Sequence, residues 1–190
     1  MGDDLLSQLL TDSEDGAMTD QDIVGLCMLF ALAGLDTVTA ATGFALEALS
    51  RDPDLRARAT RDERCLAEFV EGSLRRDSVV PTVPRVTTED VEVAGVAIPA
   101  GSMCWLAFGA ANHDPVRFDD PDTIHDTRAN HFAFGRGPHR CLGSHLARLE
   151  LRLILEEWNA RIPEYSLVRE PRVGWPRATL SHNELLVEIG

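Results

Sequence analysis

The sequence contains no lysine, so all of its positive charge at pH 7 comes from 18 arginines. These are outnumbered by 31 Asp and Glu residues, and the formal net charge is −13. A chain this acidic is repelled by a phosphate backbone, which argues against nucleic acid as a partner. We interpret the missing lysine as a codon bias toward guanine and cytosine rather than as a functional signal.

Cysteine is scarce and scattered, and no two cysteines form a C-x-x-C pair. This distribution argues against a disulfide framework. The sequence also lacks internal repeats and low-complexity segments. The four cysteines are Cys27, Cys65, Cys104 and Cys141.

No apolar run appears long enough and free enough of charge to span a bilayer, and the first residues do not resemble a signal peptide. Hydrophobic residues make up 44% of the chain and charged residues 26%. This balance over 190 residues predicts a soluble, cytoplasmic, globular protein with one core and no membrane partner.

Apolar spacing, caps and prolines predict a fold that is mainly α with small antiparallel β-sheets (α+β). Thr19, with Asp22 three residues later, is expected to cap a long helix over 19–50. Its middle is apolar almost all round, which predicts a buried helix. The other expected parts of this single domain, 1–190, are helices over 52–76, a β region over 84–108, a long loop over 110–130, a loop over 132–141, a helix over 142–160 and a β-containing tail over 164–190.

The most informative stretch is a cationic loop, broken by glycines, that ends in a cysteine just before a predicted helix: Phe134-Gly135-Arg136-Gly137-Pro138-His139-Arg140-Cys141-Leu142-Gly143. A helix N-terminus and nearby cations favour the thiolate, which is the form that binds metals. One thiolate without a second Cys or His at ligand spacing suits an axial ligand of haem iron better than a four-ligand zinc site. The alternative is a structural cysteine buried in a loop.

A second unusual stretch lies in the middle of the long helix: Ala33-Gly34-Leu35-Asp36-Thr37. Glycine in a helix interior costs about 1 kcal/mol relative to alanine, and Asp and Thr side chains compete for the helix backbone. A glycine would let a ligand approach the backbone, while Asp36 and Thr37 together could hold water and move protons. The alternative is a helix-packing glycine with polar neighbours.

The pattern F-x-x-G-x-x-x-C-x-G over 134–143 resembles the haem-binding loop of the cytochromes P450, and the match is highly specific. Residues 33–37 resemble the oxygen-activation motif of the same family. The resemblance extends over nearly the whole chain, through segments 3–6, 110–115, 119–122 and 146–150, and is closest to soluble bacterial members. It implies the C-terminal half of the P450 fold, because the family's chains are about twice as long.

The resemblance implies a haem-thiolate monooxygenase that inserts one oxygen atom from O2 into a small organic substrate. The implied cofactor is haem b with its iron ligated by Cys141, and the implied partner is an electron-transfer protein of the ferredoxin or reductase type. Thr37 would stabilise dioxygen and Asp36 would deliver protons. Further implied cofactor-binding residues are Ala33, Gly34, Phe134, Gly135, Gly143 and Ala147.

Arg85 and His139 are implied to pair with the haem propionates, a role that suits a guanidinium group. Without the resemblance, Arg85 would be an ordinary surface arginine. Arginines near the cysteine lie on the thiolate side of the cofactor in this interpretation, or on a solvated helix face in the alternative. Segments 79–83 and 179–180 are the family's substrate-contact segments that the chain contains.

One departure from the family pattern lies before Arg75, where the family has Glu-x-x-Arg. Gly72 stands where that glutamate belongs, and Glu71 points about 100° away from that position on a helix. An i,i+4 pair of Glu71 with Arg75 stays open. We expect Arg75 and its implied partner Arg128 to lack a shared anion, so that Gly72→Glu would stabilise the protein.

The other departure is length. Together with Gly72, it favours an alternative function, in which the chain is a truncated P450 remnant that acts as a haem-binding or interaction module with little oxygenase activity.

Overall fold

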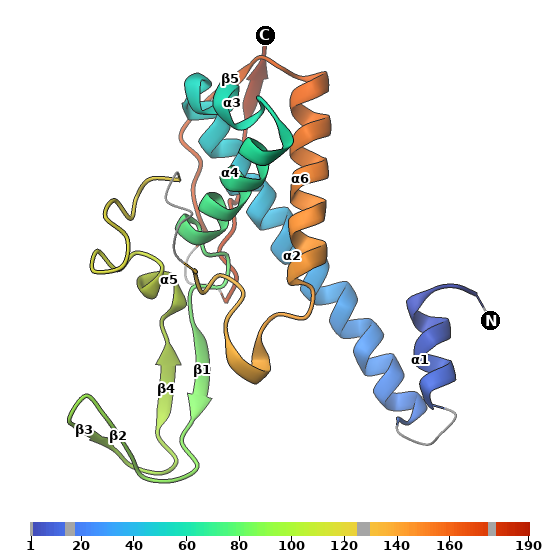
Figure 1. Ribbon diagram of the computed structural model, residues 1–190, viewed down its shortest axis with the longest axis vertical. Coiled ribbons are helices and arrows are strands. Elements are labelled where there is room, and N and C mark those ends of the chain that lie inside the picture. Colours follow the sequence, from blue (N-terminus) through green and yellow to red (C-terminus); the bar gives the residue numbers. More distant parts are fainter. Residues whose placement is uncertain (1, 14–17, 125–129, 175–177) are drawn as a thin grey trace. The chain divides into compact units, whose positions relative to one another are not determined.

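A computed structural model describes residues 2–13, 18–124, 130–174 and 178–190. It contains helices and three two-stranded antiparallel sheets, which confirms the predicted fold class (Figure 1). The chain divides into two compact units, Met1–Thr37 and Val38–Gly190. Helix α2 (Asp20–Arg51) continues through the boundary between them.

The N-terminal unit contains α1 (Leu5–Ser13) and the first part of α2. The start of α2 is fixed by a reciprocal cap. The Asp22 N–H donates to Thr19 Oγ1 (3.2 Å), and the Thr19 N–H donates to Asp22 Oδ2 (2.8 Å). These bonds satisfy two backbone donors that the first helical turn leaves open, and they confirm the predicted start of the long helix.

Burial along α2 differs from the prediction. Its last part, from Ala40 to Ser50, lies mostly in the protein interior, whereas large apolar side chains of its first part are exposed. Within the described residues of the N-terminal unit, α1 is the helix that accompanies this first part, and it leaves most of the surface uncovered. The expectation of a helix buried throughout is therefore wrong. The exposed side chains are Val24, Met28, Leu29, Leu32 and Leu35.

The length and composition of α2 would also allow it to cross a membrane, contrary to the expectation that no apolar run is long enough. The core helix of a soluble protein meets the same criterion. Only 11% of the apolar window that meets the criterion is buried in the described structure, although residues near the end of α2, such as Ala45 and Leu49, are buried. The criterion therefore does not distinguish a membrane span from a core helix here.

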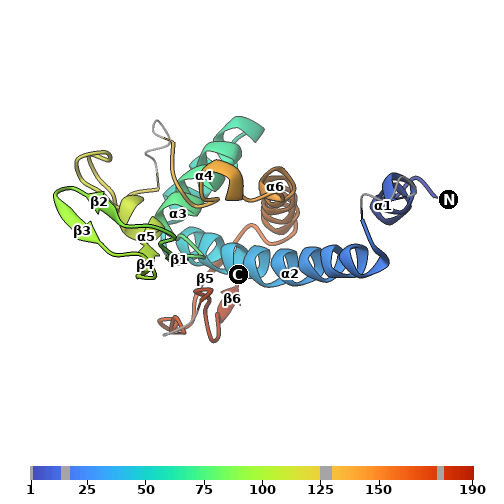
Figure 2. The same cartoon turned by 90° about the horizontal axis from the view of Figure 1, so that it is seen from below.

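The core of the C-terminal unit lies between the end of α2, α4 (Glu63–Arg76) and α6 (Ser144–Arg161); α2 crosses α6 at a steep angle in Figures 1 and 2. Short α3 (Pro53–Ala59) precedes α4, and Asp52 and Asp62 cap these two helices through their side chains. Fully burying one Leu or Phe side chain contributes about 1.5–3 kcal/mol. The large core side chains include Phe44, Leu49, Phe69, Val70, Leu151 and Leu155.

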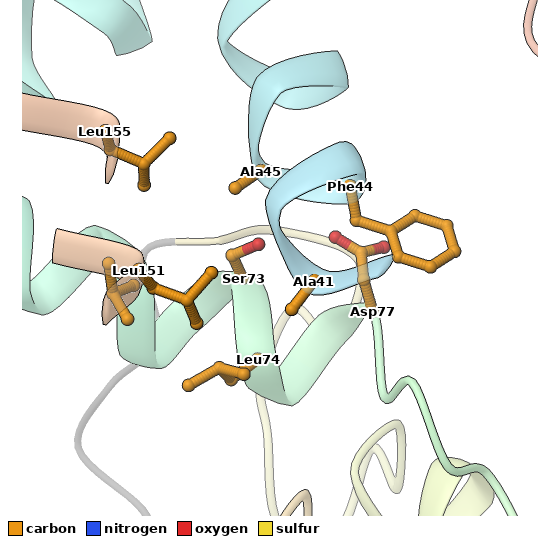
Figure 3. Close-up of a pocket in the computed structure, with 9 residues that line it drawn as sticks. Ala41, Phe44, Ala45, Ser73, Leu74, Asp77, Leu151 and Leu155 are labelled. Carbon is orange, nitrogen blue, oxygen red and sulfur yellow. The ribbon is translucent and has the colours of Figure 1, made fainter. Parts of the chain in front are cut away.

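A cavity of about 10 Å³ remains in this core, lined by side chains of α2, α4 and α6 and by Asp77 (Figure 3). A space of that size holds at most about one water molecule, so it is a packing gap and not a ligand site. Asp77 is paired with Arg76 (Oδ2 to Nη2, 2.7 Å). Burial nevertheless raises the pKa of the Asp77 carboxyl group above its ordinary value.

Two antiparallel hairpins form an arm that extends away from the helices (Figure 1). Strand β1 (Val83–Val86) pairs with β4 (Met103–Leu106), and between them β2 (Val91–Val93) pairs with β3 (Val96–Ile98). Ala94 and Gly95 both have positive φ (49° and 80°), the backbone geometry of a tight type I′ hairpin turn. These strands lie within residues 83–106, and the β region was predicted over 84–108.

The rest of the chain follows the predicted order with small shifts. Helix α5 (Phe108–Ala111) occupies the start of the predicted loop over 110–130, and residues 125–129 of that loop lie outside the described ranges. The predicted helix over 142–160 is α6. In the tail, β5 (Tyr165–Leu167) pairs with β6 (Val187–Ile189), as the strand-like segments predicted.

Candidate functional site

Cys141 ends a loop that is closed by its own backbone hydrogen bonds. The Cys141 N–H donates to the Phe134 carbonyl (N···O 2.9 Å), and the Arg140 N–H donates to the Gly137 carbonyl (3.0 Å). Gly135 and Gly137 have φ of 65° and 72°, values that favour a residue without a Cβ. The loop therefore fixes the backbone of Cys141 while leaving the residue exposed.

The same cysteine lies at the amino end of α6. Gly143 is the N-cap of this helix, and its carbonyl accepts the first helical hydrogen bond, from the Ala147 N–H (2.9 Å). The Cys141 carbonyl accepts a longer bond from the Ser144 N–H (3.4 Å). Backbone N–H groups at a helix start carry partial positive charge, so this position is suited to a thiolate.

The donor set around Cys141 consists of one sulfur. Among the described residues, no group of three or more His, Cys, Asp and Glu side chains could hold a metal ion. One sulfur suits a metal whose other ligands come mainly from a macrocycle. Leu142 beside it is 79% exposed, and Leu146 one turn later is 58% exposed. An exposed sulfur donor with exposed apolar neighbours fits a flat, largely apolar group such as haem.

The base of the cysteine loop is anchored by aromatic packing. The rings of Phe108 and Phe132 are stacked, with centroids 6.1 Å apart and planes 5° from parallel. Gly135 lies against the same Phe108 ring, because a Cβ built on it would be 3.7 Å from Cε2. Phe134 packs against the main core. The loop is thus fixed at its base and open at its cysteine end.

The structure brings six of the predicted site residues together in the cysteine loop and the first turn of α6: Phe134, Gly135, His139, Cys141, Gly143 and Ala147. Arg85 lies on β1, where its Nη1 donates to the Pro84 carbonyl (2.8 Å). His139 ends a short 3₁₀ helix, η1 (Gly137–His139). Arg85 and His139 are both exposed, and their pairing with propionates stays a prediction.

The remaining predicted residues, Ala33, Gly34, Asp36 and Thr37, lie on α2 in the N-terminal unit. Thr37 Oγ1 donates to the Ala33 carbonyl (2.7 Å), a back-bond that typically bends helices slightly. A Cβ built on Gly34 meets no atom within 4 Å. No described residue packs on this glycine, so the helix-packing alternative loses its support, and space beside the backbone is open.

The two predicted substrate-contact segments lie next to each other. The Leu180 N–H donates to the Val79 carbonyl (2.8 Å), which joins the C-terminal tail to the segment before β1. Leu180 also packs against the main core. Residues that are about a hundred positions apart in the sequence are thereby placed side by side.

Arg75 is 1% exposed, and its guanidinium donates to backbone carbonyls. Its Nη1 donates to the carbonyls of Asn112 (2.9 Å) and Pro121 (2.7 Å), and its Nη2 donates to the carbonyl of Thr123. The guanidinium also lies over the Phe118 ring, 4.7 Å from its centroid. Loop carbonyls thus accept its hydrogen bonds, and the expectation that Arg75 and Arg128 lack a shared anion stays a prediction. Arg128 lies outside the described residues.

Gly72 is explained by the same loop. A Cβ built on Gly72 would overlap the carbonyl oxygen of Ile124 and would lie 2.9 Å from its Cγ2. The backbone of the loop therefore lies directly against α4, at a distance that only glycine permits. The expectation that Gly72→Glu would stabilise the protein is wrong, since the larger side chain would displace this loop.

Glu71 does not make the i,i+4 pair with Arg75 that the sequence left open. Its carboxylate binds His131 Nε2 (3.0 Å) and Arg148 Nη2 (2.9 Å), and it also accepts from Arg148 Nε. Burial alone would raise the pKa of Glu71, but hydrogen bonds from His131 and Arg148 outweigh it and hold that pKa at about 2. Sequence reasoning missed this cluster, because its members are 17 to 77 positions apart and carry no shared motif.

Asn112 is a second structural centre that sequence reasoning did not single out. It is fully buried, its Nδ2 donates to Ser78 Oγ (2.7 Å), and its Oδ1 accepts the Phe132 N–H (2.7 Å). Together with the bond from Arg75 to its carbonyl, these contacts join α4 to the residues that begin the cysteine loop. The sequence signal that could have identified it is a polar asparagine placed directly between two alanines and a His-Asp-Pro segment.

We compared the sequence of the chain with models of protein families and with known proteins. The family model described as cytochrome P450 matches residues 2–158. The chain is 38% identical over 185 residues to 6-deoxyerythronolide B hydroxylase of Saccharopolyspora erythraea, covering 94% of this chain and 46% of the relative. It is 34% identical over 166 residues to the biotin biosynthesis cytochrome P450 of Bacillus subtilis, covering 86% and 42%.

The structural comparison gives the same result. The crystal structure of cytochrome P450 MoxA from Nonomuraea recticatena superposes with a TM-score of 0.92 at 31% sequence identity, covering 100% of this chain and 49% of that one. The chain thus spans about half the length of the relatives that it matches.

Proposed function

Because the chain belongs to the cytochrome P450 family, we propose that it provides the haem-ligating half of a monooxygenase that inserts one oxygen atom from O2 into a small organic substrate. Bound haem b would supply the oxygen chemistry, and the protein would orient it and control its protons. The observation that carries the proposal is the loop of Cys141, an exposed thiol with a fixed backbone at the start of α6.

In this function Cys141 is the thiolate ligand of the iron. The Phe134 carbonyl and the glycines of the loop set its position, and Gly143, which has no side chain, and Ala147, which has only a methyl group, would leave room for the cofactor at the start of α6. Arg85 and His139, both exposed, would pair with the two haem propionates, Arg85 through charge-assisted hydrogen bonds. These roles are supported by the placement of six of the residues in one loop and helix turn.

Asp36 and Thr37 serve proton delivery. The Thr37 hydroxyl hydrogen is engaged by the Ala33 carbonyl, so the lone pairs of its oxygen stay available to accept a hydrogen bond. Asp36 is exposed and can exchange protons with water, while Gly34 leaves room beside the helix. Thr37→Ala is expected to retain haem and to divert electrons to hydrogen peroxide. Unchanged coupling of electron use to product would contradict this role.

The electrons would come from a ferredoxin or reductase-type protein, as in the family resemblance, and the place of action would be the cytoplasm. The acidic charge of the chain gives no reason to expect a nucleic acid partner.

A second candidate function is a haem-binding or interaction module with little oxygenase activity. It is favoured by the match to only about half the length of the relatives, because a haem bound by this part of the fold alone would keep apolar surface in water. Each 100 Å² of apolar surface left exposed forgoes about 2.5 kcal/mol. Product formation with an added ferredoxin and reductase decides between the two candidates.

The proposed ligation is tested by the spectrum of the reduced carbon monoxide complex after loading with haem. A thiolate-ligated haem gives a strongly red-shifted Soret band. We expect this band in the parent chain and in Cys27→Ala, Cys65→Ala and Cys104→Ala, but not in Cys141→Ala. Retention of the band in Cys141→Ala would overturn the assignment.

A further inference from the structure

Glu71 connects three separate parts of the chain. It lies on α4, its partner Arg148 lies on α6, and its partner His131 precedes the cysteine loop. Both contacts are close, at 2.9 Å to Arg148 Nη2 and 3.0 Å to His131 Nε2. One carboxylate therefore holds a side chain that precedes the loop and a side chain on the helix that follows it.

Both partners of Glu71 pack against the same ring. The guanidinium carbon of Arg148 lies 4.4 Å from the centroid of the Phe134 ring, and the His131 ring is tilted against it at 6.3 Å. The carbonyl of Phe134 in turn accepts the N–H of Cys141 (2.9 Å). A continuous series of contacts thus leads from Glu71 to the backbone of the cysteine.

The bonds around His131 are mutually consistent. Its Nδ1 accepts the Ala133 N–H (3.2 Å), so the ring hydrogen belongs on Nε2, where it is donated to Glu71. This tautomer orients the ring and ties the backbone just before Phe134 to the same carboxylate. Glu71 is therefore linked to the loop in two ways, through the Phe134 ring and through the backbone N–H of Ala133.

A second ion pair between α4 and α6 provides a natural comparison. Glu63 Oε1 and Arg152 Nη1 are 3.0 Å apart, but the Glu63 side chain is 83% exposed, against 32% for Glu71. Exposed pairs of this kind contribute little to stability. Glu63 thus joins the same two helices as Glu71 without the half-buried setting and without a partner beside the cysteine loop.

We propose that Glu71 is a positioning residue for the Cys141 loop, acting by holding Arg148 and His131 against Phe134. The proposal rests on the proposed function only for the role of Cys141 as an iron ligand. The effect of Glu71 on the loop itself is a property of the haem-free chain.

The test is hydrogen exchange of individual backbone amides in the full haem-free chain, comparing Glu71→Gln with the matched control Glu63→Gln. Loss of charge-assisted hydrogen bonds at Glu71 should speed exchange of the Cys141 and Arg140 amides by about fivefold. Amides of the β1–β4 pairing should not change, and Glu63→Gln should resemble the parent throughout. Unchanged loop amides, or an equal increase in the β1–β4 amides, would overturn the proposal.

Glu71→Asp keeps the charge on a shorter side chain, and it replaces Glu71→Gln if that variant does not fold. It should give loop exchange between the parent and the Gln variant, and parent-like exchange of the loop would also overturn the proposal. A second readout is the reduced carbon monoxide spectrum of haem-loaded Glu71→Gln, which should lose part of the thiolate-type band. If the parent shows no such band, the proposed function fails while the exchange result still decides the role of Glu71.

Discussion

Two sites one turn apart on α4 hold other segments of the same polypeptide by different means. At Arg75, a fully buried guanidinium donates to backbone carbonyls of the loop that follows α5. At Glu71, a carboxylate that is one-third exposed binds the side chains of Arg148 and His131. The first site holds main-chain carbonyls, whereas the second depends on the charge of a carboxylate and responds to pH. The two sites therefore differ in how they can be disrupted.

The largest effect is expected from Arg75→Met, which keeps a long side chain but removes every donor. Each buried acceptor left without a donor costs about 1–3 kcal/mol, so the free energy of unfolding should fall by at least about 3 kcal/mol. Urea denaturation of the parent and the variant measures this difference. A loss below about 1 kcal/mol would mean that the loop carbonyls find other donors without cost.

Gly72→Ala should be the next most harmful change, because the new methyl group overlaps the Ile124 carbonyl. Overpacking of this kind costs about 1–3 kcal/mol. Gly25→Ala is the matched control, since a Cβ there meets no atom within 4 Å and alanine gains up to about 1 kcal/mol in a helix. A lower urea midpoint for Gly72→Ala together with a higher one for Gly25→Ala would support the close approach of the loop to α4. If both variants are stabilised alike, helix propensity alone governs Gly72.

Glu71→Gln should have a smaller effect that depends on pH. At neutral pH we expect a loss of about 1 kcal/mol, at the low end for charged hydrogen bonds because the carboxylate is partly exposed. The pKa of Glu71 is lowered from an ordinary 4.5 to about 2 in the folded protein. Its stabilisation is therefore fully present above about pH 4.5 and is lost as pH falls toward 2.

This dependence is measured as the difference in unfolding free energy between the parent and Glu71→Gln at a series of pH values. Other acidic groups titrate in both proteins and largely cancel in the difference. A difference that stays constant down to pH 3 would contradict the assigned ion cluster. Glu63→Gln should show the smallest effect of all, about 0–0.5 kcal/mol.

Local features of the fold were predictable because local residues determine them. Thr19 and Asp62 mark helix starts by accepting N–H groups within the next turn, and Gly95 marks a hairpin turn through its positive φ. The cysteine loop was found in the same way, since its glycines, cations and cysteine are adjacent in the sequence. Patterns confined to a few neighbouring residues thus gave the elements and the candidate ligand.

Features that depend on tertiary packing were not predictable. The apolar first part of α2 looks the same in sequence whether neighbours cover it or not, and in the structure it is exposed. Arg75 was expected to need an anion, but backbone carbonyls that carry no sequence signal accept its hydrogen bonds. Glu71 pairs with Arg148, which lies 77 positions further along the sequence, and no local pattern encodes this pairing.

The central claim is that Cys141 supplies the sulfur ligand of a haem iron. X-ray absorption at the iron edge tests it most directly, because this method detects sulfur among the atoms bound to iron. We predict one sulfur scatterer in the haem-loaded parent chain and in Cys65→Ala, and none in Cys141→Ala. A parent chain whose iron is bound by nitrogen and oxygen alone would contradict the account.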